Sequence, residues 1–263
     1  MTLTRRRARD LARTAVLAAA RRSDQEDRLR ELRWALRPDG ARRNRRDDAA
    51  LVIALASVLR RDSDCIDVGA NRGSVLAHMV RLAPAGRHVA FEPLPDLAAS
   101  LAQRCPQVDV RSVALSNRTG RAVFVRRPDP ALSSLESVPE DPRWRDVGLE
   151  AAQRIEVEVA RLDDVLPDGL RPAFLKIDVE DHEYQVLEGA LETLREHRPL
   201  VAFEHSLGAR AHGHEPGDVH HLLTERAGLR IFDADGGGPY DRATLREEVL
   251  TGRRWFFFAR PWD

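Results

Sequence analysis

The chain has 263 residues with 42 basic and 42 acidic side chains, so its formal net charge is zero. This length suits one large α/β domain with a sizeable core, and 43% hydrophobic with 32% charged residues is the composition of a soluble globular protein. A net charge of zero argues against a protein devoted to nucleic acid.

Redox and targeting signals predict a cytoplasmic protein. Cys65 and Cys105 are too few for a disulfide framework and lie in apolar or helical patterns, so we expect reduced, buried thiols. The longest apolar run, residues 51–59, is too short to span a bilayer. Residues 15–20 form a weak apolar segment that arginines follow at once, which argues against a signal peptide.

Charge is unevenly distributed along the chain. Residues 1–48 contain 15 Arg and 8 acidic residues, a balance of +7, which leaves −7 for residues 49–263. Roughly helical spacing of apolar residues predicts a basic, Arg- and Ala-rich extension over 1–48 that is helical or partly disordered. Such an arm can dock weakly on its own acidic domain, on a protein partner or on an anionic membrane surface.

From residue 49 onward the hydrophobic pattern alternates between helices and strands. The first half predicts helices at 49–60, 74–82 and 96–104, and strands at 65–68, 88–91 and 108–113. The second half predicts strands at 122–125, 155–159, 174–177, 200–203, 229–232 and 255–259, helices at 180–197 and 218–226, and a Pro-rich loop at 127–144. The strand–helix–strand order is typical of a parallel sheet with right-handed crossovers. A hairpin-like pair of strands at the end is typical of the methyltransferase variant of the Rossmann fold.

The first motif, Asp-Val-Gly-Ala-Asn-Arg-Gly at 67–73, joins the first strand to the next helix. Open α/β sheets bind ligands at this end of a central strand, and Gly69 allows the tight turn. A dinucleotide fingerprint would have glycine at the places of Asn71 and Ser74, so a pyrophosphate ligand is disfavoured. The carboxylate of Asp67 suits a cationic amino group better than phosphates.

Glu92 follows the second strand, 19 residues after Gly73. An acid at this place accepts hydrogen bonds from ribose hydroxyls. Alone, Glu92 is better explained as a surface carboxylate before Pro93, but together with residues 67–73 it favours an adenosyl ligand.

The second motif, Lys-Ile-Asp-Val-Glu-Asp-His-Glu at 176–183, ends the fourth parallel strand. Ionisable groups at the end of a buried strand are costly unless they are paired or functional. Lys176 and Asp178 point to the same face because side chains alternate along a strand, which predicts an ion pair between them. The preference of helix N-termini for acids accounts for Asp181 and Glu183, but not for a lysine within a strand. Lys176 is also the single lysine beside 41 arginines.

In this order and spacing, the motifs resemble those of the FkbM family of S-adenosylmethionine-dependent methyltransferases. The resemblance spans residues 62–205 and leaves residues 1–48 outside, and one departure is Asp181, where the family usually has glycine. The matching residues are Asp67-Val68-Gly69-Ala70-Asn71 with Gly73, Phe91-Glu92-Pro93, Ala114-Leu115-Ser116 with Gly120, Leu162-Asp163-Asp164, Leu175-Lys176-Ile177-Asp178-Val179-Glu180 with Glu183, Val186-Leu187 with Gly189-Ala190, and Pro199 with Glu204.

The resemblance implies an α/β, Rossmann-like class I methyltransferase fold, with a mostly parallel seven-stranded sheet, an antiparallel C-terminal strand and a helical N-terminal extension. It further implies S-adenosylmethionine as the cofactor and methyl transfer to a hydroxyl of a sugar, a glycan or a polyketide-like natural product. By position, motif 67–73 surrounds the methionine part, Glu92 holds the ribose, and Asp178 faces the sulfonium or the acceptor. The implied cofactor-binding residues are Asp67, Gly69, Ala70, Asn71, Gly73, Glu92, Pro93, Ala114, Leu115 and Asp178.

Methyl transfer needs an acceptor oxygen placed behind the methyl group and a base for its proton, and such a base typically contributes about 10²–10⁴-fold to the rate. The catalytic candidates are Asp178, Lys176, Glu180, Glu204 and His205, and binding of acceptor hydroxyls is the other role open to the last two. The histidines at 212, 214, 220 and 221 match no zinc motif, so we expect no metal ion.

Two alternative functions stay open. A non-catalytic module could bind S-adenosylmethionine and dock through its basic arm, and a nicotinamide-dependent oxidoreductase could share the fold, although Asn71 and Ser74 disfavour it. Aromatic residues make up only 5% of the chain and the predicted catalytic domain is acidic, so we expect a small-molecule or glycan acceptor and not nucleic acid. The sequence leaves open which acceptor is used and whether the chain forms a homodimer.

Overall fold

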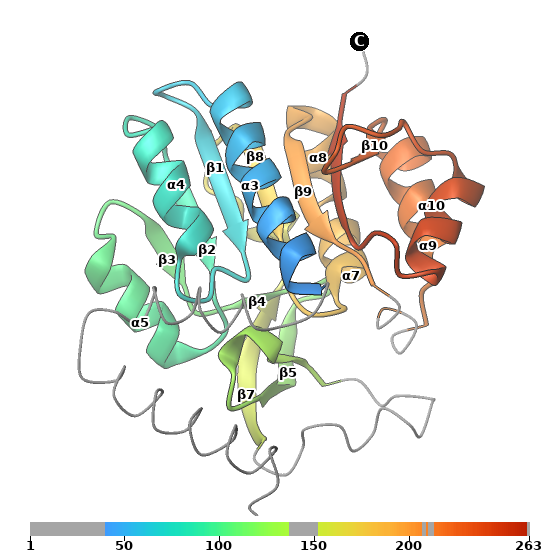
Figure 1. Ribbon diagram of the computed structural model, residues 1–263. Coiled ribbons are helices and arrows are strands. Elements are labelled where there is room, and N and C mark those ends of the chain that lie inside the picture. Colours follow the sequence, from blue (N-terminus) through green and yellow to red (C-terminus); the bar gives the residue numbers. More distant parts are fainter. Residues whose placement is uncertain (1–39, 137–151, 207–208, 210–212, 262–263) are drawn as a thin grey trace, which may run out of the picture. The chain divides into compact units, whose positions relative to one another are not determined.

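The computed structural model of the protein describes residues 40–136, 152–206, 209 and 213–261 (Figure 1). The chain divides into two units, Met1–Ala49 and Ala50–Asp263. Most of the predicted basic extension lies outside the described residues, so its helical or disordered state and its boundary at residue 48 stay predictions. Among the described helices, none combines the length and the apolar composition that a membrane span requires.

Seven strands form the main sheet, in the order β10-β11-β9-β8-β1-β2-β3. Their bounds are Asp64–Val68 for β1, His88–Phe91 for β2, Asp109–Arg111 for β3, Pro172–Ile177 for β8, Leu200–Glu204 for β9, Arg230–Asp233 for β10 and Phe256–Arg260 for β11. β1 pairs in parallel with β2 and β8, and β8 with β9, whereas β11 runs antiparallel to both β9 and β10. The predicted mostly parallel seven-stranded sheet with an antiparallel C-terminal strand is confirmed.

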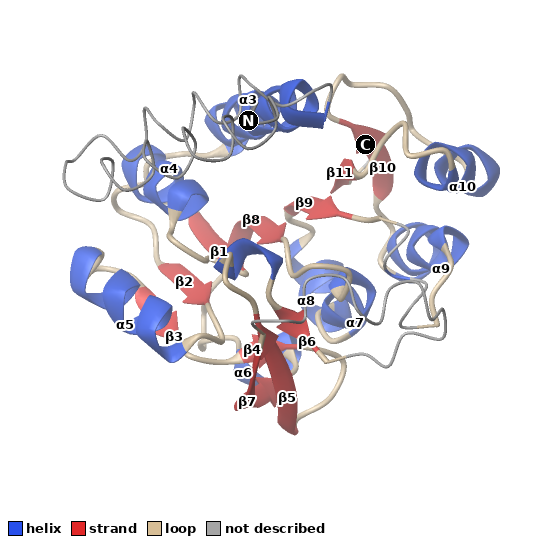
Figure 2. Cartoon of the chain, turned by 60° about the horizontal axis from the view of Figure 1, so that its bottom comes forward, coloured by secondary structure: helices blue, strands red, loops and turns tan. Residues whose placement is uncertain are grey.

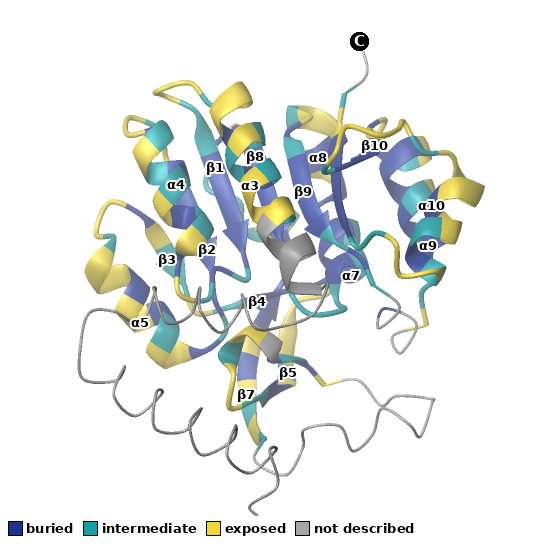
Figure 3. Ribbon diagram, viewed as in Figure 1, coloured by how far each residue is buried: buried dark blue, intermediate teal, exposed yellow. Residues whose placement is uncertain are grey.

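Helices cover both faces of this sheet (Figure 2). On one face, α3 (Gly40–Val58), α4 (Ser74–Leu82) and α5 (Pro95–Arg104) share a core with strand residues such as Cys65 and Phe174. On the other face lie α6 (Leu162–Val165), α7 (Glu183–Glu188), α8 (Leu191–His197), α9 (Pro216–His221), the π-helical turn η4 (Leu222–Arg226) and α10 (Arg242–Leu250), around strand residues such as Ile66 and Leu175. Successive strand residues alternate between these two cores, and Figure 3 shows the central strands buried between the helix layers.

A second, four-stranded sheet has the order β4-β7-β5-β6. Its strands are β4 (Ala114–Leu115), β5 (Gly120–Arg126), β6 (Ser134–Leu135) and β7 (Gln153–Ala160), and the 3-10 turn η1 (Pro130–Leu132) lies between β5 and β6. Its core contains Phe124, Leu135, Val157 and Val159. Figures 1 and 2 show this sheet beyond the carboxyl end of β1. The sequence predicts strands at 122–125 and 155–159 but assigns them to no sheet, so this second layer is a finding of the structure.

The helical segment after β8 differs from the prediction in its start and its continuity. The hydrophobic pattern predicts one helix over 180–197, whereas α7 begins at Glu183. Glu180 and Asp181 have φ angles of 54° and 74°, a left-handed conformation that is incompatible with an α-helix. The segment is also divided into α7 and α8 at Gly189, where a Cβ would overlap the backbone that follows β4.

Two other predicted helices differ from the structure, and α10 (Arg242–Leu250) has no counterpart among the predictions. α3 begins at Gly40 rather than at residue 49, and the helix predicted at 218–226 is α9 followed by η4. α10 is not predicted from the sequence, because most of its residues are exposed and only Leu245 and Val249 are buried.

Candidate active site

The predicted functional side chains meet where β1 and β8 end. These strands are neighbours, and Asp67 pairs in register with Lys176. Two residues earlier, Cys65 and Phe174 belong to the core beneath α3, α4 and α5, so alternation along the strands places Asp67 and Lys176 on that face of the sheet. The strand order reverses between β1 and β8, which is where open α/β sheets bind ligands.

The ammonium group of Lys176 joins four acceptors around the end of β1. Its Nζ donates to the carbonyl oxygens of Gly69 at 2.8 Å and Val68 at 3.4 Å. It also lies 3.4 Å from Oδ1 of Asp67 and 3.3 Å from Oδ2 of Asp178. Burial alone would lower the pKa of Lys176, but the two carboxylates outweigh that effect and raise the pKa above its ordinary value. The predicted pair with Asp178 is present, and the lysine stays charged.

Asp67 is 1% exposed, yet neither of its oxygens accepts a hydrogen bond of good geometry from the described residues. Burial raises the pKa of this carboxyl, and the charge of Lys176 opposes the rise. Oδ1 of Asn71, in the turn that follows, is also buried without a partner among the described residues. Because buried polar atoms without partners are costly, the turn has acceptor capacity to offer a ligand.

The two glycines of the 67–73 turn make close contacts within the protein. A Cβ on Gly69, whose φ is 74°, would overlap the carbonyl oxygen of Asp178. A Cβ on Gly73, whose φ is 80°, would overlap the side chain of Leu101 in α5. Gly69 therefore lets the ends of β1 and β8 approach each other, and Gly73 packs against α5. Contacts of either glycine with a cofactor stay predictions.

Glu92 fixes the same turn from the end of β2. Its Oε2 accepts a hydrogen bond from the N–H of Asn71 at 2.7 Å, and its Oε1 accepts one from the N–H of Leu94 at 3.0 Å. Burial raises the pKa of Glu92, and these two N–H groups partly lower it. The bond to Asn71 holds that residue at a left-handed φ of 48°. The predicted ribose-binding role is compatible with this geometry, because each carboxylate oxygen can accept a second hydrogen bond.

The remaining predicted cofactor residues border this turn or lie in the second sheet. Ala70 is buried, and its N–H donates to the carbonyl oxygen of Phe91 at 3.1 Å. Pro93 is half-buried and follows Glu92, two residues after the end of β2. Ala114 and Leu115 are buried in β4, where they pair with β7 rather than with the main sheet. Their places around the nucleoside stay predictions.

Two side chains that the sequence did not assign to the site hold the turn between β8 and α7. Oε1 of Glu183, which is 1% exposed, accepts hydrogen bonds from the N–H groups of Val179 at 3.1 Å and Asp181 at 3.2 Å. Ser206, which follows β9, donates its hydroxyl to Oδ1 of Asp181 at 2.6 Å. From the sequence, the preference of helix N-termini for acids is enough to account for Glu183. Only the structure shows that its side chain is buried.

Acidic side chains gather around Glu180. Burial raises the pKa of Glu180 to about 8, and the negative charges of Asp178, Glu204 and Asp181 add to the rise. The guanidinium group of Arg127, which follows β5, acts in the opposite direction. The structure thus brings together all but one of the predicted catalytic residues and adds an arginine from the loop after β5.

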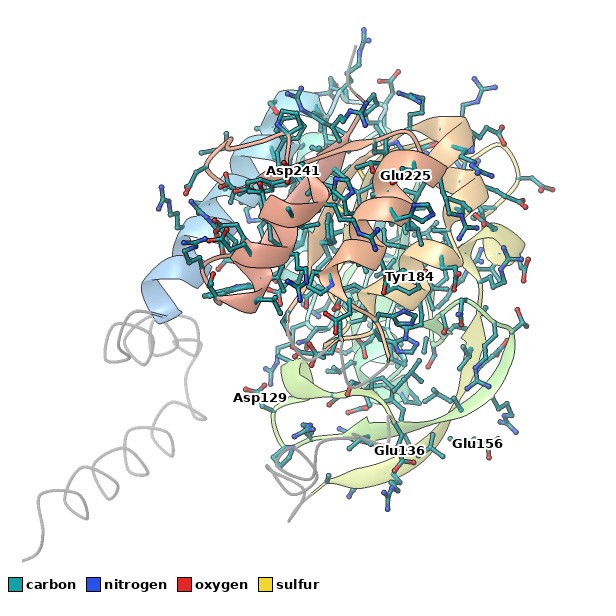
Figure 4. The ribbon with its side chains drawn as sticks, turned by 90° about the vertical axis from the view of Figure 1, so that its right-hand side faces the viewer. Asp129, Glu136, Glu156, Tyr184, Glu225 and Asp241 are labelled. Atoms are coloured by element: carbon teal, nitrogen blue, oxygen red, sulfur yellow. The ribbon has the colours of Figure 1, made fainter. Side chains whose placement is uncertain are left out.

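His205 is the predicted catalytic residue that lies apart from this group. It is fully buried, and neither ring nitrogen has a hydrogen-bond partner in the described part of the chain. Burial lowers the pKa of His205 to about 4, and its electrostatic neighbours are His214 and Asp218. His214 stacks at 3.8 Å on Tyr184, which Figure 4 labels on α7. Since consecutive residues at the end of β9 face opposite ways, His205 lies with α7 and α9 while Glu204 lies near Glu180.

The histidine-rich stretch has partners within the protein. Nε2 of His220 lies 3.1 Å from the carbonyl oxygen of Tyr240, and Nδ1 of His221 lies 3.0 Å from Glu225. His212 lies outside the described residues. Over the ranges that the structure covers, no three His, Cys, Asp or Glu side chains form a group that could hold a metal ion.

The order of the seven strands, the reversed last strand and the glycine turn at the reversal point define the class I S-adenosylmethionine-dependent methyltransferase fold. Residues 67–231 match the family model described as the Methyltransferase FkbM domain. This match covers more than half of the chain, so the protein belongs to the FkbM methyltransferase family. The resemblance of its motifs to that family is confirmed.

Two curated relatives and one solved structure show the range of similarity. Methyltransferase sdnD from Sordaria araneosa is 34% identical over an alignment of 166 positions that covers 52% of this chain and 62% of sdnD. The AMB antimetabolite synthetase AmbE from Pseudomonas aeruginosa is 29% identical over an alignment of 167 positions that covers 50% of this chain and 8% of AmbE. The crystal structure of methyltransferase FkbM from Methylobacillus flagellatus KT is 20% identical with a TM-score of 0.46, and the match covers 78% of this chain and 45% of that one. The chain therefore spans less than two thirds of each of these proteins.

Proposed function

We propose that the protein transfers the methyl group of S-adenosylmethionine to a hydroxyl oxygen of a small-molecule or glycan acceptor. The observation that carries this proposal is the buried ammonium of Lys176, which orders Asp67 and Asp178 beside the turn at Gly69. Membership of the FkbM methyltransferase family supports the reaction class.

The charges at this site favour S-adenosylmethionine over a dinucleotide. The cofactor has a positive sulfonium and a positive amino group, and the buried carboxyl of Asp67 faces the ammonium of Lys176 at 3.4 Å without a hydrogen bond of good geometry in the described part of the chain. Asp178, Glu180 and Glu92 add carboxyl groups nearby, against the ammonium of Lys176 and the guanidinium of Arg127. The two phosphates of a nicotinamide dinucleotide would be repelled by the ionised carboxylates, because like charges in a partly buried site are weakly screened.

Bound S-adenosylmethionine supplies a methyl group that its sulfonium has already activated. The protein then has to hold an acceptor hydroxyl in line with the methyl group and take up its proton. We assign Glu180 as the group that accepts the proton of the acceptor hydroxyl. Glu180 lies among the acids at the ends of β8 and β9, and its pKa of about 8 makes it a stronger base than an ordinary carboxylate. A cation bound among these acids would increase the ionised fraction of Glu180 near neutral pH, at some cost in base strength.

The transfer is balanced in atoms and charge. Bound S-adenosylmethionine would supply the methyl carbon, the acceptor oxygen would replace the sulfur on that carbon, and Glu180 would take up the hydroxyl proton. The products are a methyl ether, a neutral thioether and a protonated carboxyl group. Asp178 and Glu204 are then available to bind and orient further hydroxyls of the acceptor. Because AmbE is named as an antimetabolite synthetase, we favour a natural product among the hydroxyl acceptors.

Titration calorimetry with S-adenosylhomocysteine tests cofactor binding. We expect the parent protein to bind it and Asp67→Asn to lose at least about tenfold in affinity, because charge-assisted hydrogen bonds are roughly twice as strong as neutral ones. Glu156→Gln is the matched control, since Glu156 lies on β7 in an exposed pair with Arg121 at 3.0 Å (Figure 4). A parent protein that binds NADH but not S-adenosylhomocysteine would overturn the proposal.

Turnover separates an enzyme from a binding module. The parent is incubated with methyl-labelled S-adenosylmethionine and a panel of hydroxylated natural products and glycans, and transfer of the label is measured. Label transfer that Glu180→Gln slows by about 10²–10⁴-fold supports the assignment of the base. Cofactor binding without label transfer to any acceptor would favour the non-catalytic module.

A further inference from the structure

Two consecutive residues between β8 and α7 are left-handed although neither is glycine. The φ angle is 54° at Glu180 and 74° at Asp181. An aspartate adopts this conformation at a lower cost than a glutamate, because its short polar side chain can hydrogen-bond locally. Strained residues persist only where the surrounding structure holds them in place, so this turn requires a specific support.

The first support is the carboxyl group of Glu183. Its Oε1 accepts the N–H groups of Val179 and Asp181, at 3.1 and 3.2 Å. These two residues flank Glu180, so a single oxygen fixes the backbone on both sides of it. The two N–H groups therefore converge on an acceptor that the protein's own side chain supplies.

The second support comes from the neighbouring strand. The hydroxyl of Ser206, after β9, donates to Oδ1 of Asp181 at 2.6 Å. This distance is that of a strong hydrogen bond to a carboxylate. The left-handed turn is therefore held from α7 through Glu183 and from β9 through Ser206.

We propose that Glu183 and Ser206 are positioning residues, which hold the left-handed turn and thereby keep the carboxyl group of Glu180 among the acids at the ends of β8 and β9. The inference rests on the proposed function for the role of Glu180 as proton acceptor. The charged groups that face Glu180 are Asp178 directly after β8, Asp181 in the same turn, Glu204 on β9 and Arg127 after β5.

The burial of Glu183 exceeds what the start of a helix requires. An exposed acid would interact equally well with the helix dipole, whereas Glu183 is 1% exposed and its Oε2 has no hydrogen-bond partner among the described residues. The atom that supports the turn is Oε1, which accepts hydrogen bonds from both N–H groups. Glu183→Gln keeps such an oxygen and Glu183→Ala removes it, so these two variants form a matched pair.

Glutamate labelled with ¹³C at the side-chain carboxyl reports the ionisation of Glu180 in the full chain, and the signal is identified by its absence in Glu180→Gln. In the parent we expect a titration midpoint near 8. In Ser206→Ala and Glu183→Ala we expect the midpoint to fall by about one pH unit or more, because a released carboxyl gains water and leaves its acidic neighbours. Glu183→Gln should keep the parent midpoint.

An unchanged midpoint in Ser206→Ala and Glu183→Ala would overturn the inference, and so would an equal fall in Glu183→Gln and Glu183→Ala. If Glu183→Ala does not fold, Ser206→Ala decides, because it removes a single hydroxyl from a half-buried position. The titration contains neither cofactor nor acceptor. Failure of the parent to bind S-adenosylhomocysteine would therefore overturn the proposed function and leave the positioning result intact.

Discussion

The ammonium of Lys176 in β8 lies 2.8 Å from the carbonyl oxygen of Gly69, in the turn that follows β1. This bond joins the two strands between which the strand order reverses. An ammonium offers three donors from one compact atom, whereas a guanidinium spreads its donors over a plane. Four acceptors converge on Nζ, which accounts for a lysine at this position in a chain whose other 41 basic residues are arginines.

Substitutions at Lys176 test this relationship. Lys176→Arg should lower the affinity for S-adenosylhomocysteine at least about tenfold, because a guanidinium cannot reach Gly69 and Asp67 from one point. Lys176→Met leaves Asp67 buried without its counter-charge, and breaking a buried pair costs roughly 3–5 kcal/mol in the free energy of unfolding. Calorimetry and urea unfolding measure the two effects. Arg246→Lys, on the exposed face of α10, is the control and should stay within about 0.5 kcal/mol of the parent.

Gly69→Ala adds a methyl group where the ends of β1 and β8 meet. A left-handed alanine costs roughly 1–2 kcal/mol, and overpacking typically adds about 1–3 kcal/mol, so the free energy of unfolding should fall by about 2–5 kcal/mol. Gly252→Ala is the control, since Gly252 has a φ of 62° but no atom within 4 Å of an added Cβ. Urea unfolding measures both variants. An equal fall in the free energy of unfolding of the two would show that stability does not depend on the close approach of β1 to β8.

The raised pKa of Glu180 makes the stability of the protein depend on pH. Its folded value of about 8 lies above the ordinary value of 4.5, so the folded state binds this proton more tightly than the unfolded state. The stabilisation is present at low pH and is lost as the pH rises from 4.5 to about 8, with a slope of at most about 1.4 kcal/mol per pH unit. Glu180→Gln should reduce the slope in unfolding experiments between pH 5 and pH 9. Glu225→Gln, in an exposed pair with His221, should keep it (Figure 4).

Two substitutions at Asp181 separate the effect of backbone strain on stability from the effect of the hydrogen bond with Ser206. Asp181→Gly loses the bond to Ser206 but adopts a φ of 74° without strain, so we expect it to stay within about 1 kcal/mol of the parent. Asp181→Ala loses the bond and keeps the strain, and should be less stable than the parent by about 1–3 kcal/mol. Urea unfolding compares the two. An alanine variant as stable as the glycine variant would contradict a strained turn.

Much of the main sheet can be predicted from the sequence because its signals are local. The strand predicted at 88–91 has those bounds in β2, since a short apolar run between turn residues marks a strand without reference to distant parts of the chain. The pairing of β5 with β7 is not predicted, because register depends on contacts across a loop and has no local signal. Arg127 lies at the start of the segment between β5 and β7, far from Glu180 in the sequence. No sequence motif therefore shows that the two side chains lie near each other.

The position of His205 shows a different limit. Because it follows Glu204 directly, the sequence places both at the end of one strand and predicts both as candidates for the base. Adjacent side chains on a strand point to opposite faces, and only the packing of α7 and α9 decides which face belongs to the site. Glu204 lies near Glu180, and His205 lies near His214.

The sequence by itself determined the fold class, the family and the two strand ends at which the site forms, because these depend on hydrophobic periodicity, on glycines in turns and on the order of motifs. Tertiary structure alone decided what Lys176 and Glu183 do. Lys176 binds the carbonyl oxygens of Val68 and Gly69, and Glu183 binds the N–H groups of Val179 and Asp181. Nearly every residue carries these backbone groups, so no pattern of side chains can show which of them will converge on a buried ionisable side chain.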